Sequence, residues 1–209
     1  MNNSASETSN SPVMEEPDSL EIDRLVVLAT KGDQEAFGRV VQIYYNRVYS
    51  VIYRVVNHAE DARELSQAAW VKAWQRLGDY KQEARFYTWV YRIAVNTALD
   101  FLRKKKRRPE APLEPVLHEG GDAMEMDRQR ELADETTPLD HLHRHEVRQA
   151  FDRALLELSD EHRTALVLRE VEGMSYEEIA RVMKVRMGTV MSRLYYARKT
   201  LQQSMGKFL

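Results

Sequence analysis

Side chains that can contact the edges of DNA bases recur at helical spacing near the C-terminus. At about 100° per residue, the last predicted helix presents Gly188, Ser192, Tyr195, Tyr196 and Lys199 on one face. The opposite face is an apolar stripe formed by Val190, Leu194, Ala197 and Leu201. Arginines flank the polar face at Arg186, Arg193 and Arg198, where they would lie near phosphates. The pattern is therefore compatible with a helix that enters the major groove of a duplex.

A short helix must position this face. Ser175 and Glu178 match a capping box, in which the serine caps the helix and the glutamate reaches back to it. A break at Lys184-Val185-Arg186 separates this helix from the last one. A short capped helix, a three-residue connection and a longer helix are typical of a helix-turn-helix motif. An ordinary αα-hairpin in a helical core is the alternative interpretation.

A second set of polar side chains shares one face of a helix predicted within 86–108. Its members are Arg85, Arg92, Asn96 and Arg103, spaced by seven, four and seven residues. A basic run, Arg103-Lys-Lys-Lys-Arg-Arg108, continues from the end of this helix. A solvated helix end is the alternative explanation for the run, but we assign it to function.

The segment before this helix alternates aromatic and basic residues, beginning at Tyr80 and Lys81. Aromatic rings that stack on bases, beside cations that attract phosphates, are how proteins hold single-stranded nucleic acid. We assign Tyr80 to this role. For Phe86 and Trp89 we favour burial in the core, because large aromatic residues enter cores readily.

A third helix, predicted over 61–77, carries two tryptophans four residues apart. Trp70 and Trp74 lie at the edge of a stripe that includes Leu65 and Leu77. Paired exposed aromatic residues on a helix indicate a protein partner. Packing of both rings into the core is equally compatible with the spacing.

Candidates for catalysis or metal binding are scarce. His141, His143 and His145 alternate and could meet a metal, but we interpret them as part of a solvated segment. The chain has no cysteine, which excludes disulfides and thiolate sites. No Ser-His-Asp order or carboxylate pair stands out. We therefore expect no enzymatic activity, no cofactor and no bound metal.

The net charge of −2 over 209 residues conceals strong segmentation. Residues 1–23 carry six acidic residues and no Lys or Arg, whereas 24–108 carry 17 basic and 8 acidic residues. Residues 109–144 carry ten acidic and three basic residues. A locally basic block is compatible with a nucleic-acid partner despite the acidic total. No stretch approaches the ~18 apolar residues of a membrane span, and no signal peptide begins the chain, so we expect a cytoplasmic protein.

These patterns divide the chain into two helical blocks. We predict a disordered acidic extension over 1–23, a first block over 24–108, a linker over 109–141 and a second block over 142–206. The extension and the linker are rich in acidic residues and contain prolines. Such segments bury too little apolar surface to offset the entropy of ordering them.

Both blocks resemble bacterial extracytoplasmic-function (ECF) sigma factors of the sigma-E type. The first block is similar to sigma region 2 through "GDQEAF" (32–37), "DARELSQAAWVKAW" (61–74) and "FYTWVYRIAVNTALDFLRKKKRR" (86–108). The second block is similar to region 4 through "LREVEGMSYEEIA" (168–180) and "GTVMSRLYYARKTL" (188–201). Two such blocks, in this order and without a region 3, are specific to this family.

The resemblance implies an all-α fold with two small helical domains, a region 2 bundle and a region 4 helix-turn-helix domain, joined by a flexible acidic linker. It implies that the first domain binds core RNA polymerase and the −10 element, and that the second reads the −35 element. It also implies promoter DNA and an anti-sigma factor as further partners.

The resemblance also implies which residues contact each partner. The residues expected to contact core polymerase are Glu64, Gln67, Trp70, Val71, Lys72, Trp74 and Leu77. Those expected at the −10 element are Tyr80, Lys81, Arg85, Arg92, Asn96 and Arg103. Those expected at the −35 element are Arg186, Thr189, Met191, Ser192, Arg193, Tyr195, Tyr196 and Lys199.

Some positions differ from the family pattern. Ala68 stands where the family usually has a glutamate after Gln67. Met191 stands where it usually has lysine or arginine, and Tyr196 where it commonly has arginine. Methionine cannot read guanine as arginine does, so the sequence leaves the −35 element open. It also leaves open the genes controlled and the inducing signal.

Two other functions compete with this interpretation. One is a stand-alone helix-turn-helix regulator that binds DNA without polymerase. The other is an RNA-binding or anti-termination protein that uses the basic block. Tight promoter binding that requires core polymerase would separate the first interpretation from the stand-alone regulator.

Overall fold

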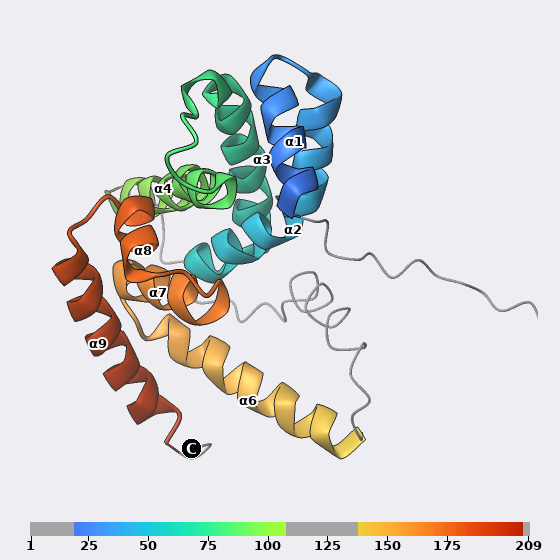
Figure 1. Cartoon of the computed structure of the whole chain (residues 1–209). Coiled ribbons are helices and arrows are strands. Elements are labelled where there is room, and N and C mark those ends of the chain that lie inside the picture. The colour runs from blue at the N-terminus through green and yellow to red at the C-terminus, as the bar shows by residue number, and fades with distance from the viewer. Residues whose placement is uncertain (1–18, 108–137, 207–209) are drawn as a thin grey trace, which may run out of the picture.

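The computed structural model describes residues 19–107 and 138–206, and over these residues the chain is helical without strands (Figure 1). This agrees with the all-α class predicted from the sequence. The first group of helices comprises α1 (Ser19–Thr30), α2 (Gln34–Val56), α3 (Ala59–Gln75), the short 3-10 helix η1 (Leu77–Asp79) and α4 (Phe86–Arg107). The second comprises α6 (Pro138–Leu156), α7 (Asp160–Leu166), the π-helical turn η2 (Val167–Val171), α8 (Tyr176–Met183) and α9 (Met187–Ser204).

Local signals set the boundaries in the first group. Gly32 has a φ of +96°, a conformation that suits glycine, and it ends the turn between α1 and α2. Asp33 then caps α2, because its side chain accepts a hydrogen bond from Ala36 N at 3.0 Å. Asn57 closes α2 in the left-handed conformation that asparagine tolerates. These caps fix the directions of α2 and α3 and so place the outer face of α3.

The first helix begins earlier than the sequence analysis expected. Residues 19–23, which were assigned to a disordered extension, form the first turns of α1. Leu25, Val26 and Ala29 of this helix are buried in the core. Packing against α2 supplies the apolar burial that stabilises α1, and the acidic composition of the segment concealed it. The remainder of the predicted extension, and residues 109–137 of the predicted linker, lie outside the described residues, whereas 138–141 belong to α6.

The predicted capping box is present at the start of α8. Ser175 Oγ accepts a hydrogen bond from Glu178 N at 3.2 Å, and Glu178 Oε2 accepts one from Ser175 N at 2.9 Å. Lys184 ends α8 with a φ of +55°, and α9 begins three residues later at Met187. The helix-turn-helix geometry expected from the spacing is therefore confirmed.

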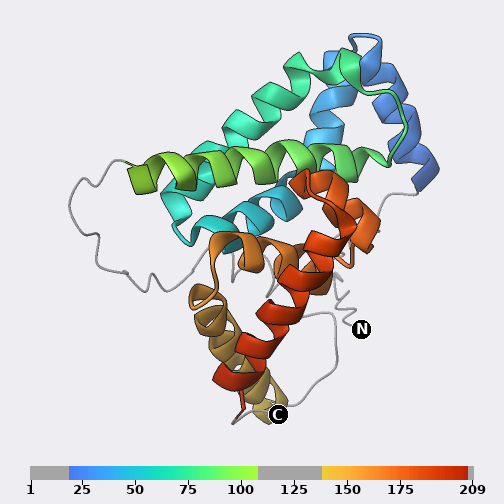
Figure 2. The same cartoon turned by 90° about the vertical axis from the view of Figure 1, so that its left-hand side faces the viewer.

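The two groups of helices pack against each other. Figures 1 and 2 show α8 beside α4, and α7 lies against α2. One continuous buried cluster contains residues of both groups, including Val55 and Ala98 of the first and Leu166 and Ile179 of the second. Figure 2 shows α8 beside α4 on the side of the first group that faces the second. This contact decides which surfaces of the first group are exposed.

Candidate functional site

The outer face of α9 is the most exposed part of the helix-turn-helix. Val190, Leu194 and Ala197 are buried, so the opposite face points to solvent, as the periodicity predicted. The exposed members of the predicted set are Arg186, Met191, Ser192, Tyr195, Tyr196 and Lys199, whereas Thr189 and Arg193 are half-buried. Ser192 Oγ donates to carbonyls of its own helix at 3.2 Å, and a rotation of its χ1 would release it for an external partner.

Large apolar and aromatic side chains dominate this face of α9. Met191 is 48% exposed, Tyr195 63% and Tyr196 55%. The two tyrosine rings meet edge to face, with centroids 5.4 Å apart. Such a surface is well suited to contacts with the methyl groups of thymine, in addition to hydrogen bonds with base edges.

One arginine beside this face already has a partner in the protein. Arg198 Nη2 donates to Glu170 Oε1 at 2.7 Å, and this hydrogen bond raises the pKa of the guanidinium. The charge of Arg198 is therefore partly compensated by a neighbouring carboxylate. Arg186 and Lys199 are exposed and lie nearer the opposite ends of α9, positions from which both could reach phosphates.

The outer face of α3 combines polar and apolar residues. Glu64, Gln67, Val71 and Trp74 are exposed there and recur at three- and four-residue spacing, with Val71 56% and Trp74 36% exposed. Lys72 is also exposed, and its Nζ donates to Thr97 Oγ1 of α4 at 3.1 Å. This face offers an apolar centre with a polar rim, which is typical of protein interfaces.

Two members of the predicted polymerase-binding set lie inside the domain. Trp70 of α3 is 6% exposed and Leu77 of η1 is 3% exposed, so neither side chain is presented to a partner in this conformation. The Phe37 ring contacts both tryptophans, with its centroid 6.1 Å from that of Trp70, in an edge-on arrangement, and 4.9 Å from that of Trp74. The spacing left both rings open to burial or exposure, and the structure buries one while leaving the other at the edge.

The loop before α4 is held by its own aromatic cluster. The Tyr80 ring packs 5.5 Å from both Phe86 and Trp89, and its hydroxyl donates to the Ala84 carbonyl at 2.9 Å. Phe86 and Trp89 are buried, as the core interpretation predicted. Tyr80 is half-buried, so it shapes the loop in this conformation, while the neighbouring Lys81 and Arg85 are exposed.

The predicted −10 set on α4 is divided between solvent and the second group of helices. Arg92 and Arg103 are exposed, and Arg103 forms an ion pair with Asp100 at 3.3 Å. Asn96 is different, because its Nδ2 donates to the Val182 carbonyl of α8 at 2.9 Å. The structure therefore brings α8 against Asn96, while the arginines of the predicted −10 set stay exposed.

Comparison with known proteins supports the division into two functional blocks. Residues 40–108 match the sequence profile described as "Sigma-70 region 2", and residues 148–201 match "Sigma-70, region 4". The chain is 37% identical over 186 residues to the RNA polymerase sigma-H factor of Pseudomonas aeruginosa, an alignment that covers 89% of this chain and 94% of that protein. The chain belongs to the ECF sigma factors.

Other relatives support the assignment of this chain to the sigma factors. The chain is 37% identical over 181 residues to the ECF RNA polymerase sigma-E factor of Escherichia coli K12, an alignment that covers 85% of this chain and 90% of that protein. The fold resembles that of CnrH, solved in complex with the cytosolic domain of CnrY, with a TM-score of 0.61, 22% identity and coverage of 91% and 99% of the two chains. It also resembles the sigma factor RpoE from Bartonella quintana, solved with the anti-sigma factor NepR, with a TM-score of 0.58, 21% identity and coverage of 81% and 96%. Sigma factors of this family direct transcription initiation at promoters and are not enzymes.

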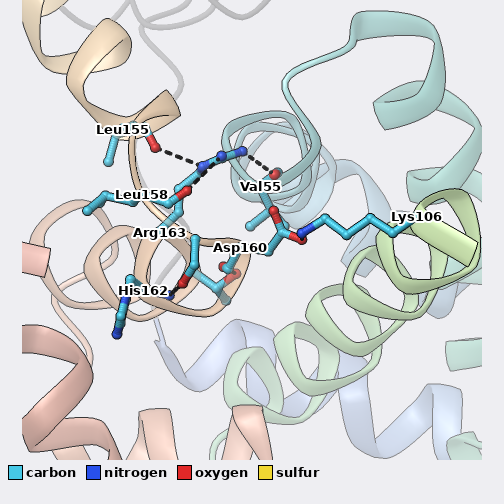
Figure 3. Close-up of polar contacts among 9 residues, drawn as sticks. Val55, Lys106, Leu155, Leu158, Asp160, His162 and Arg163 are labelled. Carbon is cyan, nitrogen blue, oxygen red and sulfur yellow. Dashed lines mark hydrogen bonds and ion pairs between the residues drawn. The ribbon is translucent and has the colours of Figure 1, made fainter. Parts of the chain in front are cut away.

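Arg163 is a buried cation of the sigma factor that was not predicted from the sequence. Arg163 is 8% exposed and donates to three carbonyls, those of Leu155 at 2.9 Å, Leu158 at 3.1 Å and Val55 at 2.9 Å (Figure 3). Burial lowers the pKa of this guanidinium. Because Val55 belongs to α2, the hydrogen bond from Arg163 to its carbonyl joins the second domain to the first. A lone arginine before an apolar run gives no sequence signal of this role.

Neither a membrane span nor a metal cluster was found among the residues that the structure describes. None of the helices within 19–107 and 138–206 has the length and apolar character needed to cross a bilayer. No group of three or more His, Asp or Glu side chains that could hold a metal ion occurs in the described part of the chain. The side chains of His141, His143 and His145 lie outside that description, so the interpretation of these histidines is not tested.

Proposed function

We propose that this sigma factor binds core RNA polymerase through the outer face of α3, reads the −35 element with α9, and captures −10 bases with the loop 80–85 and α4. The observation that carries the proposal is the face of α9. The apolar stripe of α9 is buried, while Ser192, Tyr195 and Lys199 are exposed. The capped helix α8 precedes α9 in the helix-turn-helix. This is the arrangement in which a recognition helix enters a major groove.

The requirement for polymerase tests this function against a stand-alone regulator. We expect the free protein to shift promoter DNA weakly, and the complex with core polymerase to bind it tightly and produce run-off transcripts from a promoter library. A sigma factor uses the polymerase to hold both reading domains on one DNA molecule, which raises the effective concentration of each domain at its site. Equal DNA affinity with and without core polymerase would favour the stand-alone regulator.

We predict that Met191 sets base preference at the −35 element. Methionine has no hydrogen-bond donor, so at 48% exposure it contacts apolar groups such as the thymine methyl, whereas arginine reads guanine bidentately. Met191→Arg is expected to shift the preference at one base pair toward guanine by about ten-fold or more. Run-off transcription by the holoenzyme on promoters randomised in the −35 region measures this shift.

Lys199→Gln is the matched control for that experiment, because Lys199 is exposed on the same face and is assigned to phosphate attraction. It should weaken all promoters alike and lower the slope of log affinity against log salt by about one. An unchanged ranking of promoters with Met191→Arg would show that Met191 does not face the bases.

The proposal includes a cytoplasmic location and an inhibitory protein partner. Core polymerase acts on DNA in the cytoplasm, so the sigma factor must work there. CnrH and the Bartonella quintana RpoE, which share the fold, were solved with CnrY and the anti-sigma factor NepR respectively. We therefore include an anti-sigma factor among the proposed partners of this chain.

A further inference from the structure

Lys184, in the turn between α8 and α9, has a backbone conformation that lysine rarely adopts. Its φ is +55°, in the left-handed region, where the Cβ atom of an ordinary residue crowds its own backbone and glycine is preferred. Among the described residues other than glycine, Asn57 and Gln82 also have a positive φ. Asparagine tolerates this conformation, and Gln82 lies in the loop proposed for the −10 element. The lysine at position 184 therefore needs an explanation of its own.

The fold requires this conformation but not this side chain. The backbone N–H groups of Lys184 and Val185 both donate to the Ala180 carbonyl, the second at 3.0 Å, and Val185 packs against the core. These hydrogen bonds end α8 and turn the chain toward α9. A glycine would form the same turn with less strain. The Lys184 side chain is exposed and forms no hydrogen bond or ion pair within the described part of the chain, so no such contact offsets the strain.

Two further cations surround the turn. Arg181 lies three positions earlier on α8, Arg186 immediately precedes α9, and both are exposed. Within the described residues no carboxylate pairs with either arginine or with Lys184, whereas Arg198 of α9 is paired with Glu170. The turn thus carries three positive charges without a carboxylate partner from the described domains, and an anion beside the turn would be attracted by all three.

A DNA phosphate is the anion that this turn would meet. In a helix-turn-helix the first helix crosses the sugar-phosphate backbone, while the second lies in the groove. A residue between the two helices therefore lies near the backbone at the edge of the groove. The compact ammonium group of lysine binds a phosphate as a point charge. Neither Lys184 nor Arg181 belongs to the set predicted from the sequence to contact the −35 element.

We infer that Lys184 is a phosphate-binding residue of the −35 complex, which occupies a position suited to glycine at a cost to the stability of the free protein. Strained backbone conformations persist where they serve binding, and here the strained residue carries the charge. The inference rests on the proposed −35 role of the helix-turn-helix, and it adds a contact residue and the ligand of that residue. Because phosphates carry no sequence information, Lys184 adds affinity without changing the −35 preference.

Three substitutions separate the charge of Lys184 from its backbone strain. Lys184→Gln removes the charge and keeps the strain, Lys184→Arg keeps both, and Lys184→Gly removes both. Asn57→Gly is the matched control, because Asn57 also ends a helix in the left-handed conformation, with a φ of +52°. Asn57 belongs to the first domain and to none of the predicted DNA-binding sets. All four variants are made in the full-length protein.

The stability of the free protein should follow the backbone. Lys184→Gly is expected to raise the midpoint of thermal unfolding by about 2–4 °C, because it relieves the left-handed strain of one residue. Lys184→Gln and Lys184→Arg should unfold near the midpoint of the parent. Asn57→Gly should raise the midpoint less than Lys184→Gly does, since asparagine tolerates the left-handed region. Circular dichroism of the free proteins measures the four midpoints.

Promoter affinity should follow the charge. The probe is a promoter selected by run-off transcription, bound by holoenzyme reconstituted from each variant and core polymerase. Lys184→Gln and Lys184→Gly are both expected to reduce the slope of log affinity against log salt by about one. Their loss of affinity relative to the parent should then shrink about three-fold to four-fold between about 50 and 200 mM salt. Lys184→Arg and Asn57→Gly should match the parent, and no variant should change the ranking of promoters.

Three results would overturn the inference. Unchanged affinity and salt slope in both uncharged variants would show that Lys184 does not meet a phosphate. An unchanged thermal midpoint in Lys184→Gly would show that lysine has no cost at this position. A lower midpoint in Lys184→Gln, with affinity unchanged, would assign the charge to the C-terminal end of α8 instead. The proposed function fails separately, if transcription by the parent holoenzyme does not depend on the −35 region of the promoter.

Discussion

Val71→Asp is expected to reduce the affinity of the sigma factor for core RNA polymerase by about 30-fold or more, because a charge at the centre of an apolar contact must be desolvated without a partner. Val71 is 56% exposed on the outer face of α3, between Gln67 and Trp74, so the change should leave the fold intact. Fluorescence titration of labelled sigma factor with purified core polymerase measures the affinity. Circular dichroism of the variant checks that the helices are retained.

Leu28→Asp provides a matched control for this experiment. Leu28 is 45% exposed on α1 of the same domain, so the variant introduces the same charge at an exposed apolar position of another helix. We expect it to bind core polymerase nearly as well as the parent protein does. If Leu28→Asp weakened binding and Val71→Asp did not, the polymerase-binding face would belong to α1 rather than α3.

Arg163→Ala is expected to lower the free energy of unfolding by about 3–5 kcal/mol, since it leaves three buried carbonyls without their shared donor. Two of these carbonyls, those of Leu155 and Leu158, lie in the second domain, and the third, that of Val55, lies in the first. Arg163→Lys should recover only part of the loss, because an ammonium group lacks the planar fork that reaches all three. Urea unfolding of the full chain, followed by circular dichroism, measures both effects.

Arg153→Ala is the control for Arg163, because Arg153 is exposed and its hydrogen bonds go to Gln149 of its own helix. It should change the free energy of unfolding by no more than about 0.5 kcal/mol. A loss below about 1 kcal/mol for Arg163→Ala would contradict the role assigned to the buried guanidinium.

Much of the second domain follows from local rules that the sequence states directly. The capping box at Ser175 and Glu178 involves residues three apart, and the buried stripe of α9 recurs every three or four residues. Both depend on the geometry of a single helix, which is the same in any surroundings. The exposed face of α9, and with it the set proposed to read the −35 element, could therefore be predicted without a structure.

The environment of α4 could not be predicted in this way. The analysis of its sequence concerned one polar face, whereas Tyr91, Val95 and Leu99 are buried in the structure. These three residues recur every four positions, and this pattern could have indicated a covered face of the helix. The sequence also left open whether Trp70 or Trp74 faced the core, and it gave no sign that Arg163 was buried.

The sequence by itself determined the capping box of α8 and the outward face of α9, because each depends on residues within a few positions of one another. Only the tertiary structure decided that α8 covers Asn96, that Glu178 accepts from Tyr87 and Thr88, and that Arg163 reaches Val55. These contacts join residues 86 to 108 positions apart. The polar groups in these contacts can bind water equally well. No local sequence pattern therefore distinguishes a hydroxyl that binds a distant carboxylate from one that binds water.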